Sequence, residues 1–273
     1  MAFARRREEV VLICGMESAL EHVRFAGHGG ELIDGWFAAP HAAAGERAPA
    51  LVLAPEVFGV DAHQRDVALR FASEGFATLA VEVWSREGLP GPRPTPREPS
   101  PKWTPEQVRA AVYALPDRRV LGDLEGGLAW LAARADVDAR KLAAVGFCMG
   151  GNHVYQLGCH SRRVAACVDF YGRIVYAELN AAKPMQPIEY ALNLSVPLLA
   201  FFGDKDSTIP PEHVAAFRER LEQACKNVEI VTYPEAGHGF FNDTRPTYRR
   251  AESEDAWRRT LAFLREQLEL DND

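Results

Sequence analysis

Short apolar segments alternate with amphipathic segments along most of this chain, and this alternation constrains the fold more than any other feature of the sequence. Residues 50–54 and 142–147 are continuously apolar, which is typical of strands buried on both faces of a parallel sheet. Amphipathic segments such as residues 61–73 and 211–224 lie between such strands in the chain. We therefore predict an α/β fold, with a mostly parallel open sheet and helices on both faces.

The predicted elements follow one another in an order that one domain accounts for. The first two strands form an antiparallel pair, with His28-Gly29-Gly30 as the turn between them. The predicted strands are residues 21–26, 32–38, 50–54, 76–83, 142–147, 164–170, 197–202 and 228–233. The predicted helices are residues 61–73, 106–114, 117–134, 149–158, 211–224 and 251–268. We assign residues 20–273 to this domain and residues 1–19 to an N-terminal extension of unknown order.

The composition excludes several classes of function. Hydrophobic residues make up 47% of the 273 residues and charged residues 25%, which is typical of a globular protein. The net charge of −7 disfavours nucleic acid as a partner, because its phosphates would be repelled. No apolar run approaches the roughly 18 residues of a spanning helix, so we expect no membrane partner. The five cysteines are scattered and odd in number, which favours a reducing, cytoplasmic compartment.

A predicted strand, a sharp turn and a predicted helix meet at Cys148. Residues 146–151 read Gly-Phe-Cys-Met-Gly-Gly, which matches the G-x-S-x-G nucleophile elbow with cysteine in the serine position. The nucleophile of such a turn has strained dihedral angles, and the residues two positions away must be small. The positive end of the following helix favours a thiolate, and the Met149 N–H can donate to a developing oxyanion. The motif predicts that Cys148 is a nucleophile.

Two later loops supply the acid and the base that this nucleophile needs. Residues 203–210 follow one predicted strand and contain Asp204 and Asp206, and the run Glu-Ala-Gly-His-Gly-Phe follows the next and contains His238. In hydrolases with this elbow the acid precedes the histidine in the chain. Loops after the carboxyl ends of parallel strands meet at one edge of the sheet. We therefore expect Cys148, Asp206 and His238 to lie together, with Asp204 as the alternative carboxylate.

These motifs together resemble the dienelactone hydrolase family of α/β-hydrolases. The resemblance runs from about residue 21 to residue 268 and includes the run Pro-Glu-Val-Phe-Gly at residues 55–59. Cysteine at the elbow joined to an Ala-Gly-His-Gly-Phe loop is specific, because most hydrolases of this fold carry serine. The resemblance implies an α/β-hydrolase fold with Cys148 as nucleophile, His238 as base and Asp206 as its acid partner.

The resemblance also implies roles for residues around the reacting carbonyl. Glu56 would face the resting thiol and restrain it until substrate binds. The backbone N–H groups of Val57 and Met149 would form the oxyanion hole. Arg86 matches an arginine that binds the substrate carboxylate in the best-known members of the family. The second such arginine is replaced here by Asn242, and an amide lacks the bidentate charged contact of a guanidinium.

Further side chains complete the predicted substrate site. Phe58 and Trp84 join Arg86 and Asn242 as expected substrate contacts, and the proline-rich residues 88–105 are expected to line the site. Nearby metal-binding residue types do not form a zinc motif, because they lack the paired spacing of such sites. These residues are His153, Cys159 and His160. We expect no metal and no organic cofactor.

The predicted function is hydrolysis of a carboxylic ester or enol-lactone of dienelactone type, with a small molecule as the partner. Thiolate is both a good nucleophile and a good leaving group, which suits activated esters, enol lactones and thioesters better than amides. A broad-specificity carboxylesterase or thioesterase is one alternative. A non-catalytic ligand-binding or thiol redox-sensing protein is another. The physiological substrate, and the choice between a monomer and a homodimer, stay open.

Overall fold

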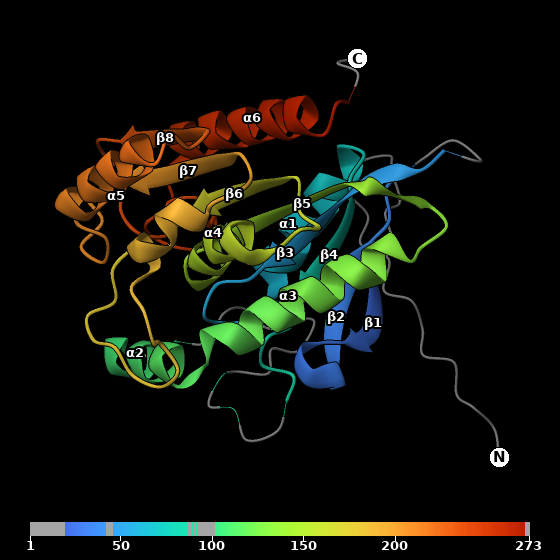
Figure 1. Ribbon diagram of the computed structural model, residues 1–273, viewed down its shortest axis with the longest axis horizontal. Coiled ribbons are helices and arrows are strands. Elements are labelled where there is room, and N and C mark those ends of the chain that lie inside the picture. The colour runs from blue at the N-terminus through green and yellow to red at the C-terminus, as the bar shows by residue number, and fades with distance from the viewer. Residues whose placement is uncertain (1–19, 42–45, 87–88, 90, 92–101, 271–273) are drawn as a thin grey trace.

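The computed structural model describes residues 20–41, 46–86, 89, 91 and 102–270. Within these residues eight strands form one sheet, in the order β1-β2-β4-β3-β5-β6-β7-β8 (Figure 1). The predicted N-terminal extension, and most of the proline-rich segment, lie outside the described residues. The strands are β1 Leu20–Ala26, β2 Leu32–Ala38, β3 Ala48–Ala54, β4 Ala77–Val81, β5 Val137–Phe147, β6 Ala166–Phe170, β7 Leu198–Gly203 and β8 Val228–Tyr233.

The pairing of the strands confirms the predicted mostly parallel sheet. β1 pairs antiparallel with β2, and β2 pairs antiparallel with β4. Every other neighbouring pair from β4 to β8 is parallel. The central strands are apolar because both of their faces are covered, and each residue of β6 and β7 is buried. The parallel strands therefore direct their carboxyl ends to one common edge.

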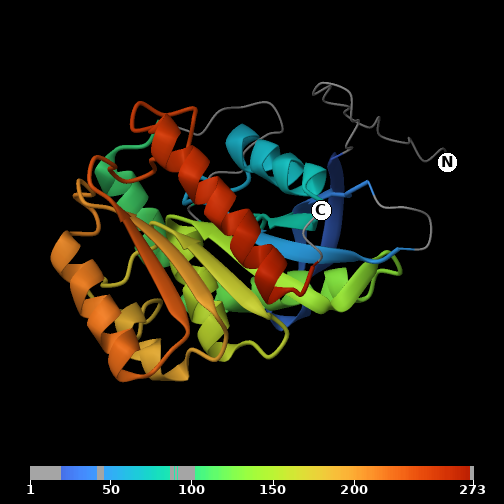
Figure 2. The ribbon, with the colours of Figure 1, turned by 90° about the horizontal axis from the view of Figure 1, so that it is seen from above.

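Helices cover both faces of this sheet (Figure 2). On one face α1 packs near α6, where the rings of Phe71 and Trp257 lie 4.5 Å apart. On the other face α3 and α4 contact each other, and α5 reaches α4 through Tyr155 and Phe217, whose rings are 4.9 Å apart. The helices are α1 Ala62–Ser73, α2 Pro105–Ala114, α3 Asp117–Ala132, α4 Met149–His160, α5 Pro211–Gln223 and α6 Arg250–Gln267, with 3₁₀ turns η1 His28–Gly30 and η2 Pro187–Asn193.

Local chemistry explains where the first two helices begin. The Asp61 side chain accepts a hydrogen bond from the Gln64 N–H at 3.0 Å and caps α1. Thr104 and Gln107 form a capping box around Pro105, so α2 begins at the last residue of the proline-rich segment. This start places the side chains of α2 at the edge where the parallel strands end.

Two differences from the predicted elements have physical causes. β5 begins at Val137, five residues before the predicted start, because the first part of the strand is polar and partly exposed and therefore lacks the apolar signal. η2 was not predicted, since a short 3₁₀ segment carries no amphipathic period. It contacts α4 and α5.

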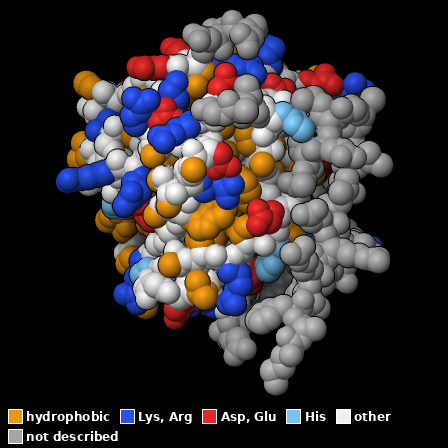
Figure 3. Space-filling view, turned by 90° about the vertical axis from the view of Figure 1, so that its right-hand side faces the viewer, with side chains coloured by type: hydrophobic (Ala, Val, Ile, Leu, Met, Phe, Trp, Pro, Cys, Tyr) orange, Lys and Arg blue, Asp and Glu red, His pale blue; other side chains and the backbone are white. Residues whose placement is uncertain are grey.

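The surface seen in Figure 3 carries acidic and basic side chains close together, around an apolar area near its centre. Among the described residues of this face, neither sign of charge forms a continuous field. In the part of the chain that the structure describes, no helix has the combination of length and apolar character that crossing a membrane requires.

Candidate active site

Cys148 occupies the sharp turn between β5 and α4. Its backbone has φ 55° and ψ −114°, a conformation that non-glycine residues rarely adopt. The Cys148 N–H donates to the Phe170 carbonyl at 2.9 Å, which ties the turn to the end of β6. A Cβ added to Gly146 would lie 2.2 Å from the Gly150 oxygen, and a Cβ added to Gly150 would lie 2.2 Å from the Ala54 oxygen. Both glycines are therefore required by close backbone contacts.

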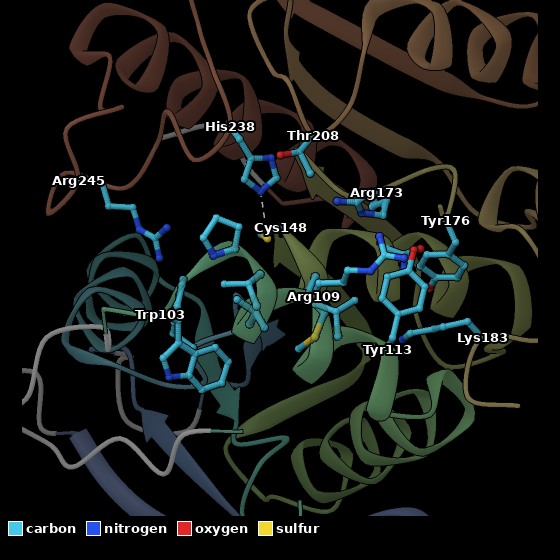
Figure 4. A pocket seen from close by; sticks show the side chains of 17 residues that line it. Trp103, Arg109, Tyr113, Cys148, Arg173, Tyr176, Lys183, Thr208, His238 and Arg245 are labelled. Atoms are coloured by element: carbon cyan, nitrogen blue, oxygen red, sulfur yellow. Dashed lines mark hydrogen bonds between the residues drawn. The ribbon is translucent and has the colours of Figure 1, made fainter. Parts of the chain in front are cut away.

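The thiol, the imidazole and a carboxylate form one continuous line of hydrogen bonds. His238 Nε2 lies 3.1 Å from Cys148 Sγ (Figure 4), and His238 Nδ1 lies 2.7 Å from Asp206 Oδ2. The other oxygen of Asp206 accepts the N–H groups of Thr208 at 2.7 Å and Ile209 at 3.1 Å. The structure thus brings together the three residues that the sequence predicted.

Of the two carboxylates in the acid loop, only Asp206 contacts the imidazole. Asp206 is 2% exposed and held by the backbone of its own loop, whereas Asp204 is exposed. A buried carboxylate that is fixed in this way can orient an imidazole, because it has no freedom to turn toward solvent.

The charges and hydrogen bonds around His238 change the pKa of its imidazole. Burial by itself would lower the pKa of the imidazole, but the negative charge on Cys148 and the hydrogen bond that the imidazole donates to Asp206 outweigh burial and raise this pKa well above its usual value. The arrangement therefore favours a protonated imidazole beside the sulfur. Such a pair can deliver an unprotonated sulfur to an electrophile and then a proton to the leaving group.

Glu56 contacts an arginine. Its Oε2 forms an ion pair with Arg245 Nη2 at 2.7 Å and accepts a longer hydrogen bond from Asn242 Nδ2 at 3.4 Å. The hydroxyl of Tyr171 lies 3.4 Å from the other oxygen. In this structure the carboxylate is directed toward Arg245, while the sulfur of Cys148 is hydrogen-bonded to His238.

Arg245 is a site residue that the sequence did not single out. It lines the pocket and its guanidinium lies 4.5 Å above the ring of Phe58. Arg245 lies three residues after Asn242, the position that matches the second arginine of the family, so a position-by-position comparison does not find it. The signal that could have found it is its place in the loop that follows His238, at the edge where the carboxyl ends of the strands gather.

The structure does not support the predicted substrate contact of Arg86. Its two terminal nitrogens donate to the carboxylate oxygens of Asp123 at 2.6 Å each, its Nε pairs with Glu31, and Nη2 also reaches the His28 carbonyl at 3.3 Å. Arg86 is buried and is not one of the residues that line the pocket. The correction has a simple cause, since the guanidinium is already satisfied by a bidentate buried carboxylate.

Trp84, which the sequence placed among the substrate contacts, lies outside the described pocket lining. The side chain is fully buried and its indole Nε1–H donates to the Val57 carbonyl at 2.9 Å. Trp84 is absent from the described pocket lining, whereas Phe58, Val57 and Met149 belong to it. The tryptophan therefore supports the loop behind the pocket.

The pocket beside Cys148 has a volume of about 420 Å³, which suits a small organic molecule. It lies between the turn that carries Cys148, the loop after β3, helix α2 and the segment after β6 (Figure 4). Its described lining comprises Val57, Phe58, Trp103, Pro105, Val108, Arg109, Val112, Tyr113, Cys148, Met149, Asn152, Arg173, Tyr176, Lys183, Thr208, His238 and Arg245.

A buried polar cluster lies behind one end of this pocket. Asp117 accepts hydrogen bonds from His153 at 2.9 Å and from the Tyr176 hydroxyl at 2.9 Å, and it pairs with Lys183. Burial alone would raise the pKa of Asp117, but its contacts with His153 and Lys183 outweigh burial and lower this pKa to about 2. This cluster fixes Tyr176 and Lys183 in the pocket wall.

The residues considered for zinc have separate surroundings. His153 contacts Asp117, the ring of His160 packs 4.9 Å from that of Tyr190, and Cys159 is buried. Among the described residues, no group of three or more His, Cys, Asp or Glu side chains is arranged to hold a metal ion.

Comparisons with known proteins identify relatives along nearly the whole chain. A protein of Salmonella typhimurium described as "Putative carboxymethylenebutenolidase" is 34% identical over 235 residues, which cover 86% of this chain and 83% of the relative. A Bradyrhizobium protein described as "Probable 2-oxo-3-(5-oxofuran-2-ylidene)propanoate lactonase" is 32% identical over 219 residues, covering 80% of this chain and 84% of the relative.

Solved structures give the same result. The crystal structure described as a "Putative Dienelactone Hydrolase" from Klebsiella pneumoniae matches with a TM-score of 0.80 and 33% identity, over 90% of this chain and 98% of the other. The model of the dienelactone hydrolase family matches residues 33–268. The protein described here is therefore a hydrolase that belongs to the dienelactone hydrolase family.

Proposed function

We propose that this protein hydrolyses a small carboxylic ester or enol-lactone through Cys148, His238 and Asp206. The observation that carries the proposal is the line of contacts from the sulfur to the imidazole at 3.1 Å and from the imidazole to the carboxylate at 2.7 Å. The Cys148 thiolate attacks the carbonyl carbon, and the C–O bond to the leaving oxygen breaks as His238 protonates that oxygen. A water molecule, deprotonated by His238, then cleaves the thioester and releases the acid and the thiol.

The oxyanion formed in each step would be stabilised by backbone N–H groups of Val57 and Met149. Met149 is the first residue of α4, so its N–H has no acceptor within the helix and lies at the positive end of the helix dipole. Val57 and Met149 both line the pocket beside Cys148. Donors aimed at the developing charge are commonly worth about 10²–10³ in kcat.

We propose that the Glu56–Arg245 ion pair keeps the carboxylate away from the reactive sulfur. Glu56 is 3% exposed, so its charge requires a partner. While Arg245 supplies that partner at 2.7 Å, Cys148 keeps its hydrogen bond to His238. Loss of the ion pair would leave a buried carboxylate close to the thiolate, which disfavours the reactive form by like-charge repulsion.

The relatives support an ester or lactone as the substrate class. Their descriptions name a carboxymethylenebutenolidase and a lactonase. A broader carboxylesterase or thioesterase is the second candidate, favoured by the observation that Arg86 is engaged with Asp123 and that Asn242 stands where a second arginine is expected.

The test is the hydrolysis of p-nitrophenyl acetate and of a dienelactone by the wild-type protein and by Cys148→Ala. We expect the variant to lose activity by about 10³-fold or more, because it removes the sulfur that contacts His238 Nε2, while its circular dichroism stays unchanged. Cys225→Ala, which changes an exposed cysteine, is the matched control and should keep full activity.

A covalent intermediate provides a second measurement. Rapid mixing with p-nitrophenyl acetate should give a burst of nitrophenol and a mass increase of one acetyl group on the peptide that carries Cys148. Wild-type levels of hydrolysis in Cys148→Ala, or an acetyl group on another residue, would contradict the proposed mechanism. A labelled but non-hydrolytic wild-type protein would instead support the alternative of a thiol sensor.

A further inference from the structure

The two ends of the pocket differ in charge. Figure 4 shows Arg245 and Trp103 on one side of Cys148, and Arg109 and Arg173 on the other. None of the described residues that line the pocket is an aspartate or a glutamate. The lining therefore presents cations and neutral groups to whatever occupies it.

Two of these cations have a carboxylate partner behind the pocket wall. Arg245 pairs with Glu56 at 2.7 Å, and buried Lys183 pairs with Asp117. These two pairs bring no net charge to the pocket.

The two arginines at the second end differ from those pairs. Arg109 contacts Glu178 at 3.0 Å, but both side chains are 53% exposed, and an ion pair so open to solvent is weak. Arg173 is partly buried, and no carboxylate is paired with it within the described residues. A partly buried guanidinium that lacks a counter-ion has a strong preference for an anionic ligand.

The walls of this end also suit a ligand with a charged terminus and an apolar body. The rings of Tyr113 and Tyr176 pack edge to face with their centroids 6.0 Å apart, and the Arg109 guanidinium lies 5.1 Å above the Tyr113 ring. The Tyr176 hydroxyl is fixed by Asp117 and by Asn152 Nδ2 at 2.6 Å. These contacts hold the aromatic walls in place, and among the described residues no carboxylate is paired with Arg173.

We propose that Arg173, assisted by Arg109, binds a carboxylate on the substrate, at the end of the pocket away from Arg245. The inference rests on the proposed ester hydrolysis and specifies its substrate class. Arg173 and Cys148 line the same pocket from different elements. An apolar spacer of the substrate therefore separates the anion at Arg173 from the scissile carbonyl at Cys148. Arg86 and Asn242, where the sequence placed the carboxylate, take no part in this subsite.

The test compares esters that differ only in the terminal group. Mono-p-nitrophenyl glutarate, adipate and pimelate carry a carboxylate, and p-nitrophenyl alkanoates of equal chain length replace it with a methyl group. For the wild-type protein we expect kcat/KM to be about 10- to 100-fold higher for the best anionic ester than for its neutral match, mainly through a lower KM. The length with the highest ratio reports the spacing between the two groups.

Variants assign this preference to residues. Arg173→Met should reduce the anionic-to-neutral ratio to near one and leave kcat/KM for the neutral ester within about twofold, and Arg173→Lys should restore part of the ratio. Arg109→Met should have a smaller effect, because its partner Glu178 and solvent already weaken its field. Arg162→Met removes the same charge from an exposed position outside the pocket lining and should change neither rate.

Two outcomes would overturn the subsite. One is a wild-type ratio of one or less at every chain length. The other is an equal loss on both esters in Arg173→Met, which would indicate a structural role. The readout that does not depend on hydrolysis is calorimetric binding of glutaric and pimelic monoanilides, which keep the carboxylate but carry an amide. Binding that requires Arg173 in a protein without esterase activity would support the subsite and contradict the proposed function.

Discussion

At Cys148 the backbone and the electrostatic environment act on the same sulfur atom. The positive φ of 55° directs the residue out of the strand and places it before the first turn of α4. His238 contacts the sulfur at 3.1 Å and carries a raised pKa, so proton and sulfur charge are coupled. Removal of the sulfur must therefore alter the titration of the imidazole.

This coupling gives a prediction for His238 alone. We expect Cys148→Ala to lower the pKa of His238, because burial, which acts to lower this pKa, is then no longer opposed by the thiolate charge. The hydrogen bond that the imidazole donates to Asp206 remains, so the pKa of His238 should fall only part of the way. Titration of the His238 ring protons by NMR measures it, with Cys225→Ala as the control. An unchanged His238 pKa would show that the sulfur carries no charge in the resting protein.

At the scale of single residues, the sequence predicted those site members that belong to local motifs. The placement of Cys148, Asp206 and His238 was predictable because each follows a strand in a recognisable loop. The partner of Arg86 was not, since Asp123 lies 37 residues further along the chain and no local pattern links the two. The catalytic roles themselves stay predictions until variants are measured.

At the scale of elements, the loop after β3 is held in place by hydrogen bonds to the residues that follow β4. The Trp84 indole donates to the Val57 carbonyl, and buried Glu82 accepts the N–H groups of Val60 at 2.8 Å and Trp84 at 3.0 Å. Burial raises the pKa of Glu82 to about 7, against these hydrogen bonds. The loop that carries the proposed oxyanion donor therefore depends on contacts outside the pocket.

We expect Trp84→Phe to lower kcat by roughly three- to tenfold with little change in KM, because one hydrogen bond that positions the Val57 backbone is lost while the pocket lining is unchanged. Steady-state kinetics on p-nitrophenyl pentanoate give both constants. Trp130→Phe, in α3 beside Phe37, is the matched control and should leave kcat unchanged. A rise in KM with constant kcat would place Trp84 in substrate binding, as the sequence predicted.

The elements were predictable where composition and period agree. The buried strands β3, β6 and β7, and amphipathic helices such as α6, lie within a few residues of the predicted ranges. The segment between β6 and β7 was not resolved by sequence patterns, although it supplies Arg173, Tyr176 and Lys183 to the pocket. It is held by tertiary contacts such as Lys183 with Asp117, which no periodicity reports.

At the scale of the whole molecule, buried carboxyl groups couple folding to pH in opposite directions. Asp117, with a pKa lowered to about 2, contributes stability that is present above its unfolded pKa of 3.8 and is lost as the pH falls toward 2. Asp169 has the reverse sign, because burial raises its pKa to about 7 despite the Gly172 N–H that donates to it at 2.7 Å. Between pH 3.8 and about pH 7 the folded protein keeps the Asp169 proton and the unfolded chain loses it.

We therefore expect Asp169 to reduce the free energy of unfolding as the pH rises from about 4 through 7, and Asp169→Asn to remove this part of the slope. An asparagine keeps the oxygen that accepts the Gly172 N–H but does not titrate. Between pH 5 and pH 8 the free energy of unfolding should fall by roughly 3 kcal/mol less in the variant than in the wild type. This figure corresponds to the two pH units between pH 5 and the Asp169 pKa of about 7. Urea unfolding at both pH values measures it. Asp204→Asn, at an exposed carboxylate, should keep the wild-type slope, and an equal slope in Asp169→Asn would mean that Asp169 is ionised in the folded protein at pH 5.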